Sequence, residues 1–223
     1  MRPWLRCALP HKGLLADPSR LLLASVGYTV RSPRERLYCT DLQNCTEFVF
    51  LRARDIPAVV SAGLADVGIT GRDHAAEADG ATVELLPLGF GVSTVRYAVP
   101  HGSGLTLGTL YGKRVATALP RLAARHLASV GVVAEVVAVS GAVESTVHLG
   151  LADAVVDVVD SGRTLAAHEL MVIGPPLLVS EAVLVTSRIG AQDPAVARLV
   201  DRLAAGLSQQ RSASHRRSDE LAG

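Results

Sequence analysis

The run VVDVVDSGRT at residues 155–164 contains the residue types best suited to chemistry in this chain. Its apolar half is typical of a buried strand, and its Ser-Gly-Arg-Thr half is typical of a turn that starts a helix. In such a turn the hydroxyl groups of Ser161 and Thr164 and the backbone N–H groups beside Gly162 can surround a phosphate. The pattern therefore predicts a phosphate site. A plain strand-to-helix turn in which Asp160 caps the helix is the alternative interpretation.

Acidic residues are concentrated around this turn. Asp157 and Asp160 lie at the end of the predicted strand, while Glu144 and Asp153 lie shortly before it. Carboxylates beside a bound phosphate are suited to sugar hydroxyls, which donate hydrogen bonds, or to a magnesium ion, which prefers oxygen ligands. Their concentration favours a phosphate site with a cation over the plain turn.

Cationic residues follow two other predicted strands. Lys12 comes directly after the first strand, in LPHKG, and Arg52 follows the strand EFVFL. Open α/β sheets bind their ligands at strand ends, where such side chains can contact pyrophosphate or polyphosphate. Arg34 and Arg36 lie in the polar stretch that precedes EFVFL. Each of these residues, taken alone, is also typical of an ordinary charged surface.

A third candidate is GITGRD, residues 68–73, where a strand runs into a glycine turn. Thr70, Gly71 and Asp73 could hold a nucleotide there, or they could only shape the turn. The sequence leaves both interpretations open.

These candidates lie on alternating predicted strands and helices. The expected strands are residues 5–9, 47–51, 65–70, 95–100, 114–117, 134–139, 154–159 and 182–186. The expected helices are residues 14–23, 55–63 with Asp55 as the cap, 122–130, 143–149 and 194–207. Strands that alternate with helices favour an α/β fold of mainly parallel sheets with crossover helices.

The chain is long enough for two lobes, since domains usually hold about 100 to 150 residues. The segment HGSGLTLG, residues 101–108, is the expected crossing between them. We therefore expect lobe I over residues 1–97 plus 182–207, and lobe II, with the phosphate site, over residues 98–181. Residues 208–223 have no apolar period and are expected to form a flexible, solvated tail.

Composition argues against several classes of protein. Hydrophobic residues make up 49% of the 223 residues but aromatic residues only 4%, which fits an aliphatic α/β core. A net charge of +1 gives no basic field that would attract nucleic acid. Cys7, Cys39 and Cys45 show no paired spacing, which argues against a disulfide framework or a zinc site. Because no signal-peptide or membrane-span pattern is found, the expected location is the cytoplasm.

Segments along most of the chain resemble one family, the ATP phosphoribosyltransferases that open histidine biosynthesis. The resemblance is carried by ALPHKGLL, EFVFLRARDIP, ADVGITGRD, LGFGVSTVRYAVP, GKRVATALPRLAARHL, SGAVESTVHLGLADAVVDVVDSGRTL and GPPLLVSEAVL. These segments follow one another in order over residues 4–190, so the resemblance is far more specific than any single motif.

The resemblance implies two lobes of the type II periplasmic-binding-protein kind, with an active site in the cleft between them. It implies transfer of the phosphoribosyl group of phosphoribosyl pyrophosphate to N1 of ATP, which gives phosphoribosyl-ATP and pyrophosphate. The 5′-phosphate would lie in the turn formed by Asp160, Ser161, Gly162, Arg163 and Thr164.

The same resemblance implies roles for the other candidates. The acids would contact ribose hydroxyls: Glu144, Asp153 and Asp157. Two of these, Glu144 and Asp157, would also bind Mg²⁺, the implied cofactor. The catalytic cations that face pyrophosphate and ATP would be Lys12, Arg52 and either Arg36 or Arg34. Thr70 and Gly71 would contribute to substrate binding.

Two residues depart from the family pattern: Leu14, where many members have Arg, and Ala142, where many have Ser. Long members carry a C-terminal regulatory domain that binds histidine, which we do not expect in this chain. Short members pair with a regulatory subunit resembling a histidyl-tRNA synthetase, which is a candidate partner besides a homodimer or larger homo-oligomer. The alternatives are the same reaction in the biosynthesis of purine-like nucleoside antibiotics of the coformycin type, or a ligand-binding homologue without catalysis.

Overall fold

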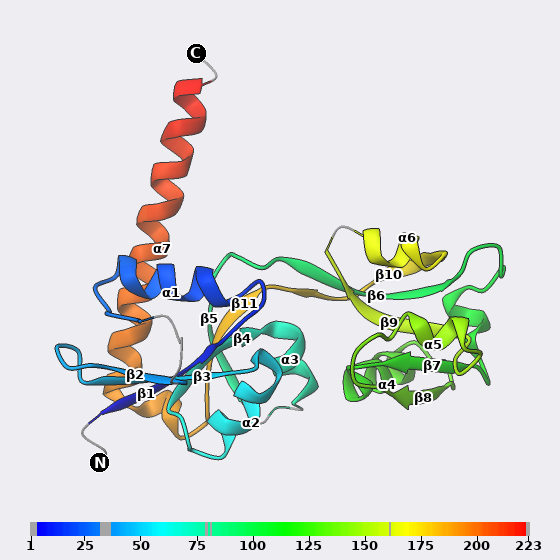
Figure 1. The fold of residues 1–223 in the computed structure, drawn as a ribbon, viewed down its shortest axis with the longest axis horizontal. Helices are drawn as coiled ribbons and strands as arrows, with labels where there is room; N and C mark the ends of the chain where they lie inside the picture. Colours follow the sequence, from blue (N-terminus) through cyan, green and yellow to red (C-terminus); the bar gives the residue numbers. More distant parts are fainter. Residues whose placement is uncertain (1–3, 32–36, 79, 81, 161, 222–223) are drawn as a thin grey trace. The chain divides into compact units, whose positions relative to one another are not determined.

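The computed structural model describes residues 4–31, 37–78, 80, 82–160 and 162–221 (Figure 1). Its contacts divide the chain into unit 1, residues 1–71, 80–91 and 182–223, and unit 2, residues 72–79 and 92–181. The return to unit 1 at Ala182 is where the sequence predicts it. The earlier boundary lies after Gly91 rather than after residue 97, and residues 101–108 lie inside unit 2. Among the described residues, no helix is long and apolar enough to cross a membrane.

Unit 1 contains a six-stranded mixed sheet. Its strands, in spatial order, are β2 (Tyr38–Asp41), β3 (Thr46–Leu51), β1 (Leu5–Pro10), β4 (Val67–Gly71), β11 (Ala182–Thr186) and β5 (Val83–Pro87). Only β1 pairs in parallel with its neighbours, β3 and β4, and the outer pairs are antiparallel. The sheet is mixed: the parallel strands β3, β1 and β4 form its centre, and the antiparallel strands β2 and β11 lie on either side of them.

Helices cover both faces of this sheet. The helical segments are α1 (Ala16–Ser25), η1 (Ala53–Asp55), α2 (Ile56–Ser61), η3 (Gly190–Gln192) and α7 (Pro194–Leu221). Leu23 of α1 and Leu199 and Leu203 of α7 are buried in one core cluster, because their spacing places them on one side of each helix. On the other face α2 lies so close to β4 that a Cβ on Gly68 would be 2.3 Å from Ile56 Cγ2.

Two predictions for unit 1 are wrong in detail. Asp55 occupies the position before α2, but its side chain makes no capping hydrogen bond, because η1 runs directly into the helix. Residues 208–221 continue α7 instead of forming an irregular tail. This stretch contains neither Gly nor Pro, so nothing in its backbone ends the helix after the buried Leu207.

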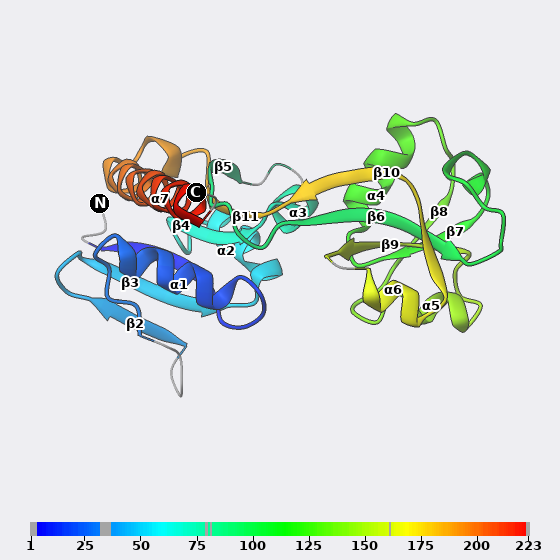
Figure 2. The same ribbon diagram turned by 90° about the horizontal axis from the view of Figure 1, so that it is seen from above.

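Unit 2 contains a five-stranded mixed sheet, seen from above in Figure 2. The order is β10 (Leu170–Ser180), β6 (Ser93–Pro100), β9 (Ala154–Val159), β7 (Arg114–Thr117) and β8 (Glu135–Ala138). Here β9, β7 and β8 are parallel, whereas β6 is antiparallel to both β9 and β10. The remaining segments are α3 (Arg72–Glu77), η2 (Leu107–Leu110), α4 (Pro120–Ser129), α5 (Ser145–His148) and α6 (Arg163–Ala167).

The alternation of side chains along β6 and β9 separates two cores in unit 2. Tyr97 and Val156 point to the face covered by α4, where Leu122 and Leu127 pack against them. Ala98 and Val155 point to the opposite face, together with Val143 before α5 and Leu165 of α6. The residue between Val156 and Val158, Asp157, therefore lies on the face of α5 and α6.

Helix α3 belongs to unit 2 although the chain enters it directly from β4. The Ser180 hydroxyl donates to Asp73 Oδ1 at 2.8 Å, which ties α3 to the end of β10. The Glu77 carboxylate accepts hydrogen bonds from the backbone N–H groups of Arg121 and Leu122, at 3.0 and 2.8 Å. Glu77 thus supplies the N-terminal cap that α4 lacks in its own sequence.

We expect Glu77→Ala to lower the free energy of unfolding by about 1 kcal/mol, the usual cost of losing a helix cap. The measurement is the urea midpoint of unfolding, compared with Glu135→Ala on the exposed edge strand β8. Equal midpoints for the two variants would show that the cap contributes nothing.

Candidate functional site

The carboxyl edge of the unit 2 sheet is the first candidate for a ligand site. Because β7, β8 and β9 are parallel, their carboxyl ends meet there, and α4, α5 and α6 all begin there. Glu77 already occupies the start of α4. Neither α5 nor α6 has a side-chain cap. Groups that could receive a ligand are therefore found at the starts of α5 and α6.

The predicted phosphate turn connects β9 to α6. Gly162 adopts φ 72°, a left-handed conformation that glycine accepts without strain, and the next residues begin the helix. The side chains of Asp160, Arg163 and Thr164 are exposed, and Ser161 lies outside the described residues. Among the described residues no side chain makes a capping hydrogen bond to α6, so the alternative in which Asp160 serves only as a cap is not supported.

Asp157 and Glu144 approach each other on the α5 and α6 face. Burial raises the pKa of Asp157, a hydrogen bond from the Val158 N–H to its carboxylate opposes that rise, and the negative charge of Glu144 adds to it. The charge of Glu144 therefore acts on the Asp157 carboxylate, on the same face of the unit 2 sheet.

Asp153 lies elsewhere. It precedes β9, and at about 3.3 Å per residue the strand separates it from the turn by about 20 Å. Its carboxylate accepts a hydrogen bond from the Arg114 N–H at 2.9 Å and lies 3.7 Å from Arg114 Nε. Asp153 thus fixes the amino end of the sheet, and the predicted group of four acids is not a single cluster.

Sequence reasoning did not identify Arg96, which lies directly opposite Asp157 in the β6–β9 pairing. Its Nη2 donates to the Gly174 carbonyl at 2.8 Å, where β10 has a register shift. Its Nε is buried without a hydrogen-bond partner among the described residues. The available signal was a charged residue inside the apolar strand VRYAVP, a position that usually has a specific partner.

The carboxyl edge of the unit 1 sheet collects the other predicted residues. Pro10 pairs with Leu51 and Ala8 with Gly68, so the residues that follow β1, β3 and the end of β4 are neighbours. These are Lys12, Arg52, Thr70 and Gly71. Lys12 and Arg52 are exposed. Arg34 and Arg36 lie outside the described residues.

Thr70 has a local structural role. Its side chain is buried, and its hydroxyl donates to the Ala53 carbonyl at 2.7 Å. This bond holds the turn that follows Arg52. Of the two interpretations of GITGRD, shaping a turn therefore describes the Thr70 hydroxyl, and Asp73 likewise holds Ser180.

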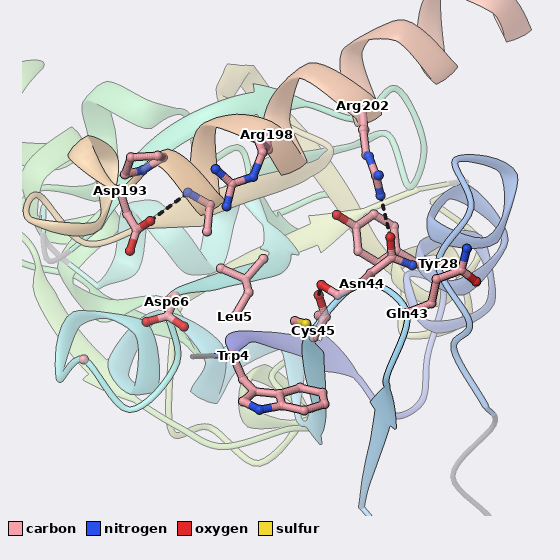
Figure 3. A pocket seen from close by; sticks show the side chains of 14 residues that line it. Trp4, Leu5, Tyr28, Gln43, Asn44, Cys45, Asp66, Asp193, Arg198 and Arg202 are labelled. Carbon is pink, nitrogen blue, oxygen red and sulfur yellow. Dashed lines mark hydrogen bonds between the residues drawn. The ribbon is translucent and has the colours of Figure 1, made fainter. Parts of the chain in front are cut away.

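Unit 1 also contains a pocket of about 790 Å³ at the opposite, amino edge of its sheet (Figure 3). Its walls include Trp4, Asp66 and Arg198, and none of the predicted site residues. Arg202 donates to Asn44 at 2.7 Å and lies over the Tyr28 ring, so its charge is engaged within the protein. We do not assign this pocket to the reaction, because sheets of this type bind ligands at their carboxyl edges.

Comparison with protein families and curated proteins gives one consistent match. A family model described as ATP phosphoribosyltransferase matches residues 52–205. A protein of that description from Saccharopolyspora erythraea is 47% identical over 200 residues, which cover 89% of this chain and 71% of the relative. Another, from Mycobacterium tuberculosis, is 48% identical over 181 residues, which cover 81% of this chain and 64% of the relative.

Solved structures resemble the fold. An ATP phosphoribosyl transferase from Thermotoga maritima, in a complex described as HisG:HisZ, aligns with a TM-score of 0.79 at 23% identity, covering 92% of this chain and 99% of that one. The GluR0 ligand-binding core of Nostoc punctiforme, in complex with L-glutamate, aligns with a TM-score of 0.62 at 17% identity, covering 97% and 96%. These likenesses confirm the expected two-lobed fold of the type II periplasmic-binding-protein kind.

We expect Asp157→Asn to raise the thermal midpoint of the ligand-free protein near neutral pH, because it removes a half-buried charge beside Glu144. A raised pKa means that ionised Asp157 weakens the fold as the pH rises through that pKa. The gain should therefore disappear on acidification. Asp153→Asn is the matched control and should lower the midpoint, since that carboxylate has Arg114 as a partner. A lower midpoint for Asp157→Asn at neutral pH would contradict the repulsion.

Proposed function

The chain belongs to the ATP phosphoribosyltransferase family, and from this premise we propose that it transfers the phosphoribosyl group of phosphoribosyl pyrophosphate to N1 of ATP. The products are phosphoribosyl-ATP and pyrophosphate. The observation that carries the proposal is the position of Asp157 on the face where the turn at Gly162 begins α6, together with the charge of Glu144 that acts on it. A phosphorylated ribose has hydroxyl groups that could donate to the two carboxylates and a phosphate that could bind in the turn.

The 5′-phosphate is assigned to the turn formed by Asp160, Ser161, Gly162, Arg163 and Thr164. Its backbone N–H groups and the Thr164 hydroxyl are donors, and Arg163 adds a positive charge. Glu144 and Asp157 are acceptors for the ribose hydroxyls. A ligand that supplies hydroxyl donors to these two carboxylates also relieves their mutual repulsion.

The two-lobed fold alone does not favour catalysis, because a ligand-binding core has it as well. The pair of carboxylates does favour it. Among the described residues no group of three or more His, Cys, Asp and Glu side chains could hold a metal ion, so an all-protein cage is not the expectation. Two carboxylates fit Mg²⁺, which usually takes one or two of them with substrate phosphates and water. Bound there, Mg²⁺ would neutralise charge on the diphosphate.

The reaction needs little proton transfer. Adenine N1 carries no proton at neutral pH, so its electron pair can form the new bond to the ribosyl carbon without a general base. The bond from that carbon to the pyrophosphate oxygen breaks, and its electron pair leaves with pyrophosphate. The protein's contribution is therefore orientation and electrostatic stabilisation of the leaving group.

We assign this stabilisation to the cations at the carboxyl edge of unit 1. Lys12 and Arg52 are exposed at neighbouring strand ends, and Arg36 or Arg34 is assigned to the same role. Thr70 contributes by holding the turn after Arg52, and Gly71, the last residue of β4, is assigned to substrate binding. Asp153 contributes only through its bond to Arg114.

The physiological setting is part of the proposal. We place the reaction in histidine biosynthesis and in the cytoplasm, where the free cysteines Cys7, Cys39 and Cys45 stay reduced. The Thermotoga maritima relative forms a complex described as HisG:HisZ, and a regulatory subunit of that kind is the partner we propose besides a homodimer or larger homo-oligomer.

The direct test mixes the purified protein with ATP, phosphoribosyl pyrophosphate, Mg²⁺ and a pyrophosphatase. We expect the near-ultraviolet absorbance of N1-substituted adenine to rise, and to stay flat when either substrate is omitted. The regulatory subunit is included in a parallel reaction. Tight binding of both substrates without product in either reaction would favour the ligand-binding homologue.

Arg52→Ala should lower kcat by about 10²- to 10³-fold, the loss typical of removing one well-placed donor from a transition state. The Kd for phosphoribosyl pyrophosphate, measured by calorimetry, should change much less. Arg54→Ala is the matched control, since Arg54 lies in the same turn and is paired with Asp55 at 3.7 Å. Equal losses in kcat and in binding would refute a leaving-group role for Arg52.

A further inference from the structure

The carboxylate of Glu144 lies close to the imidazole of His168. His168 ends α6, and its Nε2 lies 3.8 Å from Glu144 Oε1. Glu144 directly precedes α5 and His168 directly follows α6, and these two helices cover one face of the unit 2 sheet (Figure 2). Among the described residues, His168 is the only basic side chain with a nitrogen within 4.0 Å of the Glu144 carboxylate.

The environment of Glu144 explains why a partner is needed. Only 16% of its side chain is exposed, and its negative charge acts on Asp157, which has the same sign. A glutamate has more rotatable bonds than an aspartate, so without a partner its carboxylate would turn away from Asp157. The imidazole approaches from the side of α6 and limits that movement.

We propose that His168 is a positioning residue for the phosphoribosyl site, which holds the Glu144 carboxylate beside Asp157 so that both can accept hydrogen bonds from the ribose hydroxyls. The proposal rests on the proposed function and refines one part of it. His168 does not contact the substrate; it acts through Glu144. The helix that begins with the phosphate turn thus also supplies, at its other end, the side chain that orients a ribose ligand.

The backbone around His168 should survive substitution. Its N–H donates to the Leu165 carbonyl at 3.1 Å, a bond that any residue except proline can make. Its side chain is 39% exposed, so little core packing is lost. His168→Ala removes the contact with Glu144, whereas His168→Gln keeps a nitrogen donor of similar reach.

The test measures binding of ribose 5-phosphate and of inorganic phosphate by calorimetry. His168→Ala should weaken ribose 5-phosphate binding by about three- to tenfold, as expected for one hydrogen bond, and leave phosphate binding unchanged. His168→Gln should restore most of the affinity. His148→Ala is the matched control, because His148 is an exposed histidine on α5. This variant should bind both ligands as tightly as the wild-type protein does.

A double substitution separates positioning from an independent contact. If His168 acts through Glu144, adding His168→Ala to Glu144→Gln should cause no further loss of ribose 5-phosphate binding. Additive losses, or unchanged affinity in His168→Ala, would overturn the inference while the proposed function stands. Failure of the wild-type protein to bind ribose 5-phosphate or phosphoribosyl pyrophosphate would overturn both.

Discussion

Parallel pairing of β9 with β7, and of β7 with β8, determines where chemistry can occur in unit 2. Strands that run in the same direction end at the same edge, so the helices that follow them also begin there. The edge therefore contains the phosphate turn and the start of α5. The same rule acts in unit 1, where β1, β3 and β4 place Lys12 and Arg52 at neighbouring strand ends. Parallel strands thus give both units a similar layout without any likeness between their residues.

The carboxylates of Glu144 and Asp157 interact unfavourably in the ligand-free unit 2, because both carry a negative charge when ionised. Burial and the negative charge of Glu144 both raise the pKa of Asp157, so the ionised form of Asp157 is disfavoured there. Such local cost is common where a protein must bind a hydroxyl-rich or cationic ligand. Asp153 differs, because its carboxylate accepts a hydrogen bond from the Arg114 N–H and so stabilises the amino end of the unit 2 sheet.

Local patterns were sufficient for most elements but not for those that depend on partners. Strands β7, β9 and β11 have the predicted bounds, since each is a short apolar run between turn residues. Strand β10 was missed because Gly174, Pro175 and Pro176 resemble a turn; the structure accommodates them in an edge strand with a register shift. The residues of the candidate site also differ in whether a local pattern is enough to recognise them. The turn at Gly162 is a local signal, whereas Arg96 and His168 are recognised only through strand pairing and helix placement.

Helix α3 shows that the two units cannot be separated by cutting the chain once. A fragment that began at Val92 would contain every strand of unit 2 and still lack α3. The first N–H groups of α4 would then face solvent, and Ser180 would lose its acceptor. An isolated unit 2 would therefore need residues 72–79 supplied as a separate peptide or through a rearranged chain order. During synthesis this short segment is made before every strand of the sheet that it helps to complete.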